Sequence, residues 1–484
     1  MRHWWMSVGT MAGLLAGCAH PPSQPNHHTT SHAHFHQVAA QVTDWPTNAR
    51  PIEPEFQGAR PVEFYVGQAV ERNPQIMASY QAVAAQVEVI PQVTALDDPM
   101  LTNTIWPIAE RSPQSLMGRM PYGLMASQQL PWFGKLRVKG EVAQQEVRMA
   151  VARLAQAELK VIEEVHLAYY ELYFNQRAID VTLENRQLLE DLLQIAEARY
   201  RTGDTSQQDI IRAQVEVDRV DQRLITLRQA LDQGQADLAQ LLHIHPDSKP
   251  EALTELAPSS VPSEIERLYD LATGCRPELQ EQMAAIVREQ RSVELARLDY
   301  YPDVNVGLMW DVMTTNQAMA PNADGTDNLG FTIGMNIPLW RNRLQAGVNE
   351  AEQRVAQSAR QYDATLDETF RQIRRRMVQA RSQEEQIRLY RENIIPRSEQ
   401  TLEISIADYR VGRVSFLQLL DNWMQLLTLE VQLARLEADL RQTLASLERS
   451  VGCATAEEII PNEQTAEELR ATRLQPSRSL DSTF

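Results

Sequence analysis

The chain has 484 residues, a formal net charge of −18 at pH 7 and only 6% aromatic residues. An acidic chain without a dominant basic face is not expected to bind nucleic acid, whose phosphates attract Lys and Arg. The composition is rich in Ala, Gln, Glu, Leu and Arg, which favours long helices over several compact domains. One basic cluster, Arg371 with residues 374–376, lies in a segment rich in Glu and Gln and is expected to be a solvated helix face.

The N-terminus has the pattern of a secretory signal. Arg2 precedes a short apolar segment, residues 4–15, and small residues precede Cys18. The Leu-Ala-Gly-Cys ending resembles a bacterial lipobox, which implies a signal peptide at 1–17 and an acylated Cys18. An ordinary signal peptide with an incidental Cys is the alternative. Ala19 resembles the residue found in lipoproteins sent to the outer membrane, which implies a lipid tether rather than a membrane-spanning helix.

Residues 18–60 are expected to be a lipid-anchored tether, because their prolines prevent regular structure. Half of the ten histidines of the chain lie within ten residues of this tether, namely His27, His28, His32, His34 and His36. Imidazoles at this density can bind Zn, Cu, Ni or Co ions weakly. A structureless polar tether is the other interpretation.

The first structural repeat is expected over residues 61–245. Asn73-Pro74 opens a helix that should end at Pro91. Strands are expected at about 98–132, where apolar residues alternate with Ser127 and Gln129; the partner strand, about 100–108, is less regular.

A long helical hairpin is expected next, at 135–242. Residues 141–202 contain no Gly or Pro, and their apolar residues recur with a sevenfold period, as in a coiled coil. At 1.5 Å per residue this run is roughly 90 Å long, so other helices must lie alongside it. The chain should turn at Gly203 and return from Ser206.

The plan then repeats after a connector at 246–263, which is rich in Pro and Ser. The second repeat is expected over 264–453, with strands at about 302–340 and a helical hairpin at 343–450. Residues 407–412 match residues 198–203 in order, and a polar C-terminal tail follows at 454–484.

Each predicted strand pair has one apolar and one polar face, as in membrane β-barrels. Four strands cannot close a barrel and open strand edges are not tolerated in lipid, so several chains must share one. The predicted fold is mainly α with a membrane β part, built from duplicated helix–β-hairpin–long helix–helix repeats. Three chains with four strands each would form a 12-stranded β-barrel, continued by an α-helical coiled-coil barrel. A soluble sheet packed on helices is the alternative.

Several motifs resemble the TolC family of outer-membrane efflux channels over residues 62–453. They are the N-P-x-I-x-A start at 73–78, the Q-x-L-P-W-F-G-K run at 128–135 and the Y-x-x-G turns at Tyr200 and Tyr409. The resemblance implies a homotrimer in outer-membrane lipid, with its helical barrel in the periplasm. It also implies a tripartite pump completed by a periplasmic adaptor and an inner-membrane proton-driven transporter.

The resemblance places a gate at the far ends of the helical hairpins. The two acidic positions of the family's selectivity ring fall on Gln418 and Asp421, so only one carboxylate remains. A closing hydrogen bond is expected between Tyr409 and Asp209, although a helix-surface carboxylate favoured by the helix dipole is the other interpretation of Asp209.

The family's tight turns, at which an adaptor would dock, correspond to Gly203 and Gly412.

The exported substrate is less well defined. The P-W-F-G-K-L-R run at 131–137 and the I-P-L-W-R-N-R run at 337–343 resemble the heavy-metal (cobalt-zinc-cadmium or copper-silver) branch. With the histidine tether, they imply efflux of heavy-metal cations. Efflux of drugs or organic solutes by the same fold is the alternative, and a lipid-anchored scaffold without a pore is a hypothesis of another class.

No enzyme activity and no cofactor are expected, because the chain has no phosphate loop, nucleophile elbow or HExxH motif. His166 lies alone on an apolar helix face and is expected to be a core histidine.

Two cysteines follow Cys18, and neither belongs to a CxxC pair. Separate buried thiols are the favoured interpretation of Cys275 and Cys453, whereas an oxidising compartment would permit a disulfide. The family plan implies that both lie at the equator of the tube, where they could bond.

Overall fold

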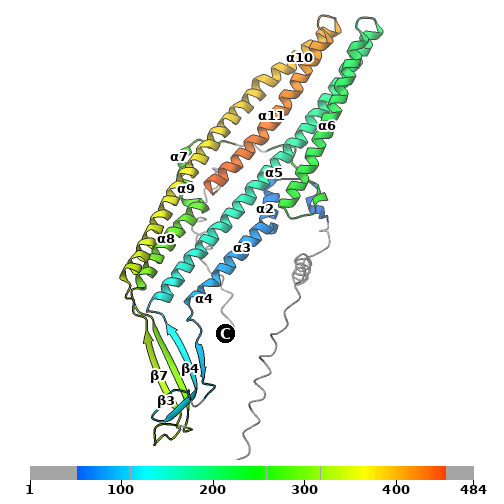
Figure 1. Ribbon diagram of the computed structural model, residues 1–484. Helices are drawn as coiled ribbons and strands as arrows, with labels where there is room; N and C mark the ends of the chain where they lie inside the picture. The colour runs from blue at the N-terminus through cyan, green and yellow to red at the C-terminus, as the bar shows by residue number, and fades with distance from the viewer. Residues whose placement is uncertain (1–51, 109–110, 257–259, 317, 454–484) are drawn as a thin grey trace, which may run out of the picture. The chain divides into compact units, whose positions relative to one another are not determined.

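The computed structural model describes residues 52–108, 111–256, 260–316 and 318–453, and these are mainly helical with one antiparallel sheet (Figure 1). The expected signal peptide, the acylated Cys18, the five clustered histidines and the polar tail lie outside the described residues.

The first half runs from a short helix through strands to two long helices. Its elements are η1 (Pro54–Phe56), β1 (Gly58–Arg60), α2 (Val62–Arg72), α3 (Pro74–Val87), α4 (Val89–Thr94), β2 (Met100–Ile105), β3 (Gln114–Ser115), β4 (Gly118–Leu130), α5 (Lys135–Arg201) and α6 (Gln207–Leu241).

The second half has the same order of short helix, helix, hairpin, long helix and returning helix. Its elements are η3 (Pro246–Ser248), β5 (Pro250–Ala252), α7 (Ile265–Cys275), α8 (Pro277–Leu298), β6 (Val304–Thr314), β7 (Asn328–Met335), α9 (Arg341–Leu389), η4 (Tyr390–Ile394), α10 (Ile395–Arg410) and α11 (Phe416–Val451).

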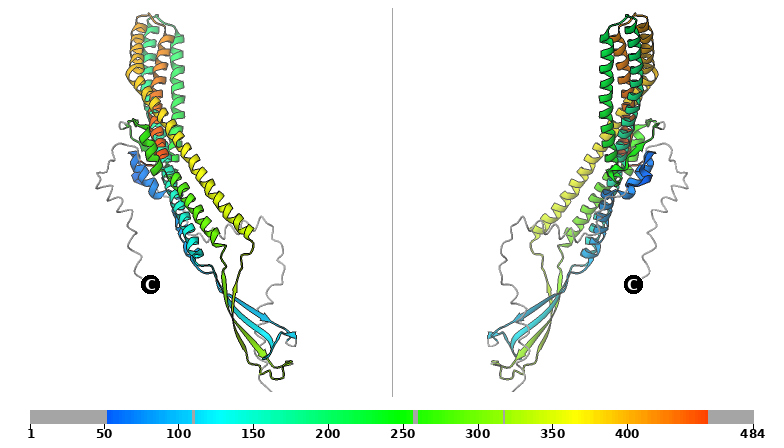
Figure 2. Two further views of the ribbon diagram at one scale, coloured as in Figure 1. Left: turned by 90° about the vertical axis from the view of Figure 1, so that its left-hand side faces the viewer. Right: turned by 90° about the vertical axis from the view of Figure 1, so that its right-hand side faces the viewer.

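Helix α5 is the longest helix of the described chain, and other helices pack along it. Its 67 residues extend roughly 100 Å at the usual rise, and α6, α8 and α11 pack along it (Figure 2). One core cluster joins α2, α5 and α6 around Tyr65, Tyr169 and Leu172, and a second joins α5, α6, α10 and α11 around Trp423. No helix in the described part of the chain is long and apolar enough to cross a membrane.

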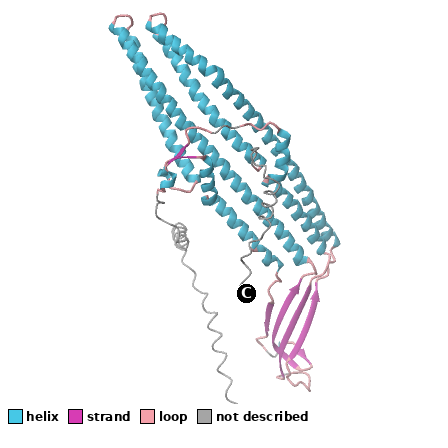
Figure 3. Ribbon diagram, turned by 180° about the vertical axis from the view of Figure 1, so that it is seen from behind, coloured by secondary structure: helices cyan, strands magenta, loops and turns pink. Residues whose placement is uncertain are grey.

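The main sheet has the strand order β2-β4-β6-β7, with β3 paired to β4, and all its pairs are antiparallel (Figure 3). Because side chains alternate along a strand, Trp310, Leu329 and Phe331 lie on one face, and each is more than 40% exposed. The other face carries Ser127, Gly307 and other small or polar residues, together with the paired Met125 and Met309. The apolar alternation expected at 329–339 is present, although the strand ends at Met335.

The junction between sheet and helix explains why the Q-x-L-P-W-F-G-K run is built as it is. Gly134 takes the left-handed conformation (φ +91°), which redirects the chain from β4 into α5. The buried Lys135 ammonium contacts Asp303 at 3.0 Å and Asp299 at 3.2 Å. The Trp132 ring stacks on Tyr301 with centroids 5.1 Å apart. The run therefore joins the two halves where strands become helices.

Two segments predicted to be irregular contain short strands. β1, within the expected tether, pairs in parallel with β5, within the expected connector. Tyr65 stabilises this pair by donating its hydroxyl to the Glu251 carbonyl at 3.0 Å, and the fully buried Phe56 packs beneath it. The folded part thus begins before Val62, because buried aromatic side chains outweigh the neighbouring prolines.

One proline does not end a helix where the sequence predicted that it would. The helix after Asn73 ends at Val87, and Pro91 lies in the first turns of α4, where its missing N–H breaks no hydrogen bond. Pro396, by contrast, follows the π-helical turn η4, which widens the helix ahead of a residue that cannot donate.

Cys275 and Cys453 form a disulfide, with Cα atoms 5.8 Å apart and a sequence separation of 178 residues. The expectation of two separate thiols is therefore wrong. The end of α7 and the second residue after α11 meet because both helices pack against α9 around Ile373 and Met377. The backbones approach closely here: a Cβ atom on Gly452 would lie 2.7 Å from the Arg276 Cα.

Candidate functional site at the helical tips

Two turns close the helical hairpins: the first tip, residues 202–206, joins α5 to α6, and the second tip, residues 411–415, joins α10 to α11 (Figure 1). In the first, the Gly203 amide donates to the Tyr200 carbonyl at 3.0 Å and the Asp204 amide to the Arg199 carbonyl at 2.9 Å. This pair of bonds is the Schellman motif, which requires a left-handed residue; Gly203 supplies it with φ +84°.

The second tip repeats this geometry. The Gly412 amide donates to the Tyr409 carbonyl at 3.1 Å, the Arg413 amide donates to the Asp408 carbonyl at 2.9 Å, and Gly412 has φ +78°. The two glycines thus occupy equivalent tight turns, and the resemblance had implied a tight turn at each of these positions. Their role in docking an adaptor stays a prediction.

The two tip tyrosines have opposite environments. Tyr200 is 45% exposed, whereas Tyr409 is 2% exposed and packs on Phe416 with ring centroids 5.3 Å apart. The difference arises because α10 and α11 pack against α5 around Tyr409, while Tyr200 points away from that cluster. Equivalent sequence positions therefore have different roles.

Arg199 connects the tips, a role that no sequence motif indicated. Its guanidinium donates to the Tyr409 carbonyl and, at 3.2 Å, to the Asp204 carbonyl. It also lies over the Tyr409 ring, 4.6 Å from the centroid. A signal was present: Arg199 occupies the position that Asp408 holds in the second tip, so the two motifs differ in charge there.

The hydrogen bond expected between Tyr409 and Asp209 is absent. The Asp209 carboxylate accepts from the Thr205 hydroxyl instead, and the buried Tyr409 hydroxyl has no partner of good geometry among the described residues. Burial raises the pKa of Tyr409; the nearby Thr205 hydroxyl lowers it in part and the Asp209 charge raises it further. Tyr409, Thr205, Asp209 and Arg199 therefore lie together, but Thr205 takes the place expected for Tyr409.

Gln418 and Asp421 lie in the first turns of α11, and both are exposed. Residues three apart share a helix face, so the two side chains point in a similar direction. The Gln418 amide nitrogen donates to Asn422 at 3.3 Å, and Asn422 donates to Ser405 at 2.7 Å. Within the described residues the Asp421 carboxylate makes no ion pair. A single chain thus presents this carboxylate to its surroundings, while Tyr409 is covered.

A buried polar contact lies further along the same helices. Asn185 of α5 donates its amide to the Glu430 carboxylate of α11 at 2.6 Å, and Trp423 donates its indole N–H to the Asn185 carbonyl at 3.2 Å. Burial raises the pKa of Glu430, the Asn185 hydrogen bond lowers it in part, and Glu399 and Glu184 raise it. This contact is a second polar site that sequence periodicity did not indicate.

No group of three or more metal-ligating side chains (His, Cys, Asp or Glu) lies together in the described part of the chain. His166 is partly buried beside Tyr170, with ring centroids 5.9 Å apart, and burial lowers its pKa.

The long helical hairpins joined to an open antiparallel sheet define the fold class of the described chain. Three solved structures share the fold. CusC has 18% identity and a TM-score of 0.69, and the match covers 84% of this chain and 99% of that chain. VceC from Vibrio cholerae has 18% identity and a TM-score of 0.67, covering 82% and 97%. The Campylobacter jejuni CmeC outer membrane channel has 16% identity and a TM-score of 0.65, covering 90% and 94%.

The family model "Outer membrane efflux protein" matches residues 65–242 and 268–453, so the chain belongs to that family. The resemblance to the TolC family is confirmed. The protein is accordingly an outer-membrane protein with a periplasmic helical extension, in a family of transport channels rather than enzymes. No curated protein sequence matches the chain.

Proposed function

We propose that this protein is the outer-membrane channel of a tripartite efflux system. It conducts substrate passively, and its partners are a periplasmic adaptor and an inner-membrane proton-driven transporter. The observation that carries the proposal is the sheet: its exposed face is apolar, and its edge strands β2 and β7 have no neighbour on one side within the described chain. Both features require covering by lipid and by further copies.

The assembly proposed is a homotrimer. Three copies of the four long strands would close a 12-stranded barrel, and the paired helices would continue it as a coiled-coil tube. Acylation of Cys18 would anchor each chain in the outer membrane. Crosslinking followed by native mass spectrometry of the detergent-solubilised protein tests this: a trimer supports the proposal, and a monomer that forms no pore in planar bilayers supports the scaffold alternative.

The substrates proposed are heavy-metal cations. The support is the cluster of His27, His28, His32, His34 and His36 and the single ring carboxylate at Asp421, which three copies would focus at the mouth of the tube. The loss of the second carboxylate at Gln418 favours organic solutes as the second candidate.

The deciding experiment is growth inhibition of a deletion strain and its complemented control on Cu, Ag, Zn, Co, Cd and Ni salts and on a panel of dyes and antibiotics. Sensitivity confined to metals supports the metal proposal. Complementation by a chain with all five tether histidines changed to Ala tests the tether: reduced metal resistance with normal organic resistance is expected. Sensitivity to organic compounds alone contradicts the metal proposal.

A further inference from the structure

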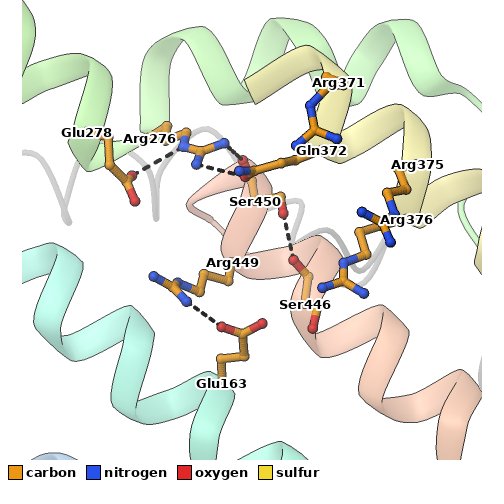
Figure 4. A pocket seen from close by; sticks show the side chains of 10 residues that line it. All are labelled: Glu163, Arg276, Glu278, Arg371, Gln372, Arg375, Arg376, Ser446, Arg449 and Ser450. Atoms are coloured by element: carbon orange, nitrogen blue, oxygen red, sulfur yellow. Dashed lines mark hydrogen bonds and ion pairs between the residues drawn. The ribbon is translucent and has the colours of Figure 1, made fainter. Parts of the chain in front are cut away.

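A cavity of about 400 Å³ lies between the helices (Figure 4). It is bounded by α5, the start of α8, the middle of α9 and the end of α11. Its lining is almost entirely polar, and it consists of Glu163, Arg276, Glu278, Arg371, Gln372, Arg375, Arg376, Ser446, Arg449 and Ser450. The basic cluster of α9, expected to be a solvated helix face, contributes three of its arginines to this cavity.

Three of the five lining arginines are already neutralised. Arg276 contacts Glu278 at 3.2 Å, Arg449 contacts Glu163 at 2.5 Å, and Arg371 contacts Glu368, outside the cavity, at 2.5 Å. Arg371 lowers the pKa of Glu368 to about 2, so that partner stays ionised. These pairs leave no acidic side chain in the described lining of the cavity for the remaining two arginines.

Arg375 and Arg376 are the uncompensated charges. Within the described part of the chain neither makes an ion pair or a hydrogen bond, and Figure 4 shows both directed from α9 towards Ser446 of α11. Arg375 is exposed and Arg376 is partly buried, and the Ser446 and Ser450 residues opposite are buried. The chain as a whole is acidic, with a net charge of −18, but these two adjacent cations form a small basic region. Their like charges repel each other unless an anion lies between them.

The rigid side of the cavity is held by Arg276. Arg276 is 7% exposed, and its guanidinium donates to the Ser450 carbonyl and to Gln372, each at 3.0 Å. The disulfide between the adjacent Cys275 and Cys453 fixes the same wall. A cavity with one fixed wall and two free guanidinium groups on the other is suited to an anion with several oxygens, since each planar guanidinium can bind two of them.

We propose that this cavity is a binding site for a soluble multivalent oxyanion of the diphosphate class, held by the guanidinium groups of Arg375 and Arg376. The volume, at the low end for ligand pockets, fits such an ion with water but not a large organic solute. An aromatic or apolar ligand would find almost no apolar surface there. The site is separate from the channel function proposed above and stands on the cavity itself.

The test is isothermal titration calorimetry of the full-length protein in detergent with inorganic pyrophosphate. Saturable binding is expected, and the double variant R375Q/R376Q should weaken it at least tenfold. R374Q is the matched control: Arg374 is exposed on the same helix and does not line the cavity, so affinity should change less than twofold. R375K/R376K keeps the charge but loses the planar geometry, so an intermediate loss is expected.

Folding of each variant is checked by its thermal unfolding midpoint and by the absence of free thiols. Equal weakening by R374Q, or no saturable binding by the natural chain, overturns the proposal. Binding that appears only in E457Q/E458Q would show that the acidic start of the tail competes for the cavity, which also overturns it. Displacement of pyrophosphate by a short-chain phosphatidate at lower concentration would assign the site to a lipid headgroup instead.

Discussion

At the scale of single residues, glycines with positive φ differ in what surrounds them. Gly203 and Gly452 have nearly equal φ values of +84° and +86°, yet a Cβ atom on Gly203 would meet nothing within 4 Å, whereas one on Gly452 would collide with the backbone of Arg276. The first position therefore needs glycine only for its conformation, and the second also for close backbone approach.

Gly452→Ala is therefore expected to destabilise the protein by several times more than Gly203→Ala. The left-handed conformation alone costs an alanine about 1 kcal/mol. At Gly452 the added Cβ atom would also clash with the backbone of Cys275 and Arg276 and push it away, which adds to this cost. Chemical unfolding measures both changes. Thiol titration of the folded Gly452→Ala protein should detect a fraction of broken disulfide, and equal losses of stability in the two variants would contradict the expectation.

Arg199 is the second residue whose role was decided in space. Its hydrogen bond to the Tyr409 carbonyl and its position over the ring hold the first tip against the second. Arg199→Gln removes the cation, and a loss of about 1–2 kcal/mol of local stability is expected.

If these contacts close the proposed channel, Arg199→Gln should raise its conductance in planar bilayers. Arg201→Gln is the control, because Arg201 is exposed two residues further along and its side chain makes no hydrogen bond or ion pair within the described chain. An equal increase in both variants would show a general effect of lost charge rather than an opened gate.

At the scale of elements, the packing of α5 on α11 carries a pH dependence. Burial raises the pKa of Glu430 above its ordinary value of 4.5. A carboxyl whose pKa is raised in the folded state stabilises the protein most when the pH is below the pKa that the group has in the unfolded state. This stability is lost as the pH rises through the pKa of the folded state. At neutral pH the ionised Glu430 is therefore unfavourable.

Glu430→Gln should consequently raise the thermal unfolding midpoint at pH 7, because the amide can still accept from Asn185 without carrying charge. Since the carboxylate is only partly buried, the gain is expected to be on the order of 1 kcal/mol or less. The gain should shrink below pH 4.5, where Glu430 is protonated in both states. Glu403→Gln, at an exposed position of α10, should show no such trend; a gain independent of pH at position 430 would argue for a packing effect.

At the scale of the whole molecule, the disulfide covalently links two residues that are far apart in the sequence. It closes a loop of 178 residues that includes all of α8 to α11 and the strands between them. By the chain-entropy argument, such a loop destabilises a fully unfolded chain by about 5 kcal/mol, which is an upper value because real unfolded chains retain structure.

The double variant C275S/C453S is thus expected to unfold at clearly lower denaturant concentration than the natural chain. Reductant should lower the stability of the natural chain and leave the double variant unchanged. Peptide mapping without reduction gives an independent check, since it should recover one peptide pair joined through these cysteines. Two free thiols in the mapped protein would contradict the structure.

The sequence predicted elements better than contacts. The Pro- and Gly-free run before Gly203 specified a very long helix, and alternation at 329–335 specified a strand, because periodicity records which face each residue turns. The sequence did not predict β1 and β5, because strands of three residues are too short to show any periodicity. These strands form because Tyr65 and Phe56 pack against them. At the candidate site it located both tip turns but neither Arg199 nor the Thr205–Asp209 contact.

The amino-acid sequence by itself determined the order of helices and strands, the two tip turns and the family resemblance, because these depend on residues that are neighbours along the chain. Only the tertiary structure decided that Tyr409 is buried while Tyr200 is exposed, that Cys275 bonds to Cys453, and that Arg375 and Arg376 enter a cavity. Each of these depends on which distant helix lies opposite a given face, and local periodicity specifies the face but not its neighbour.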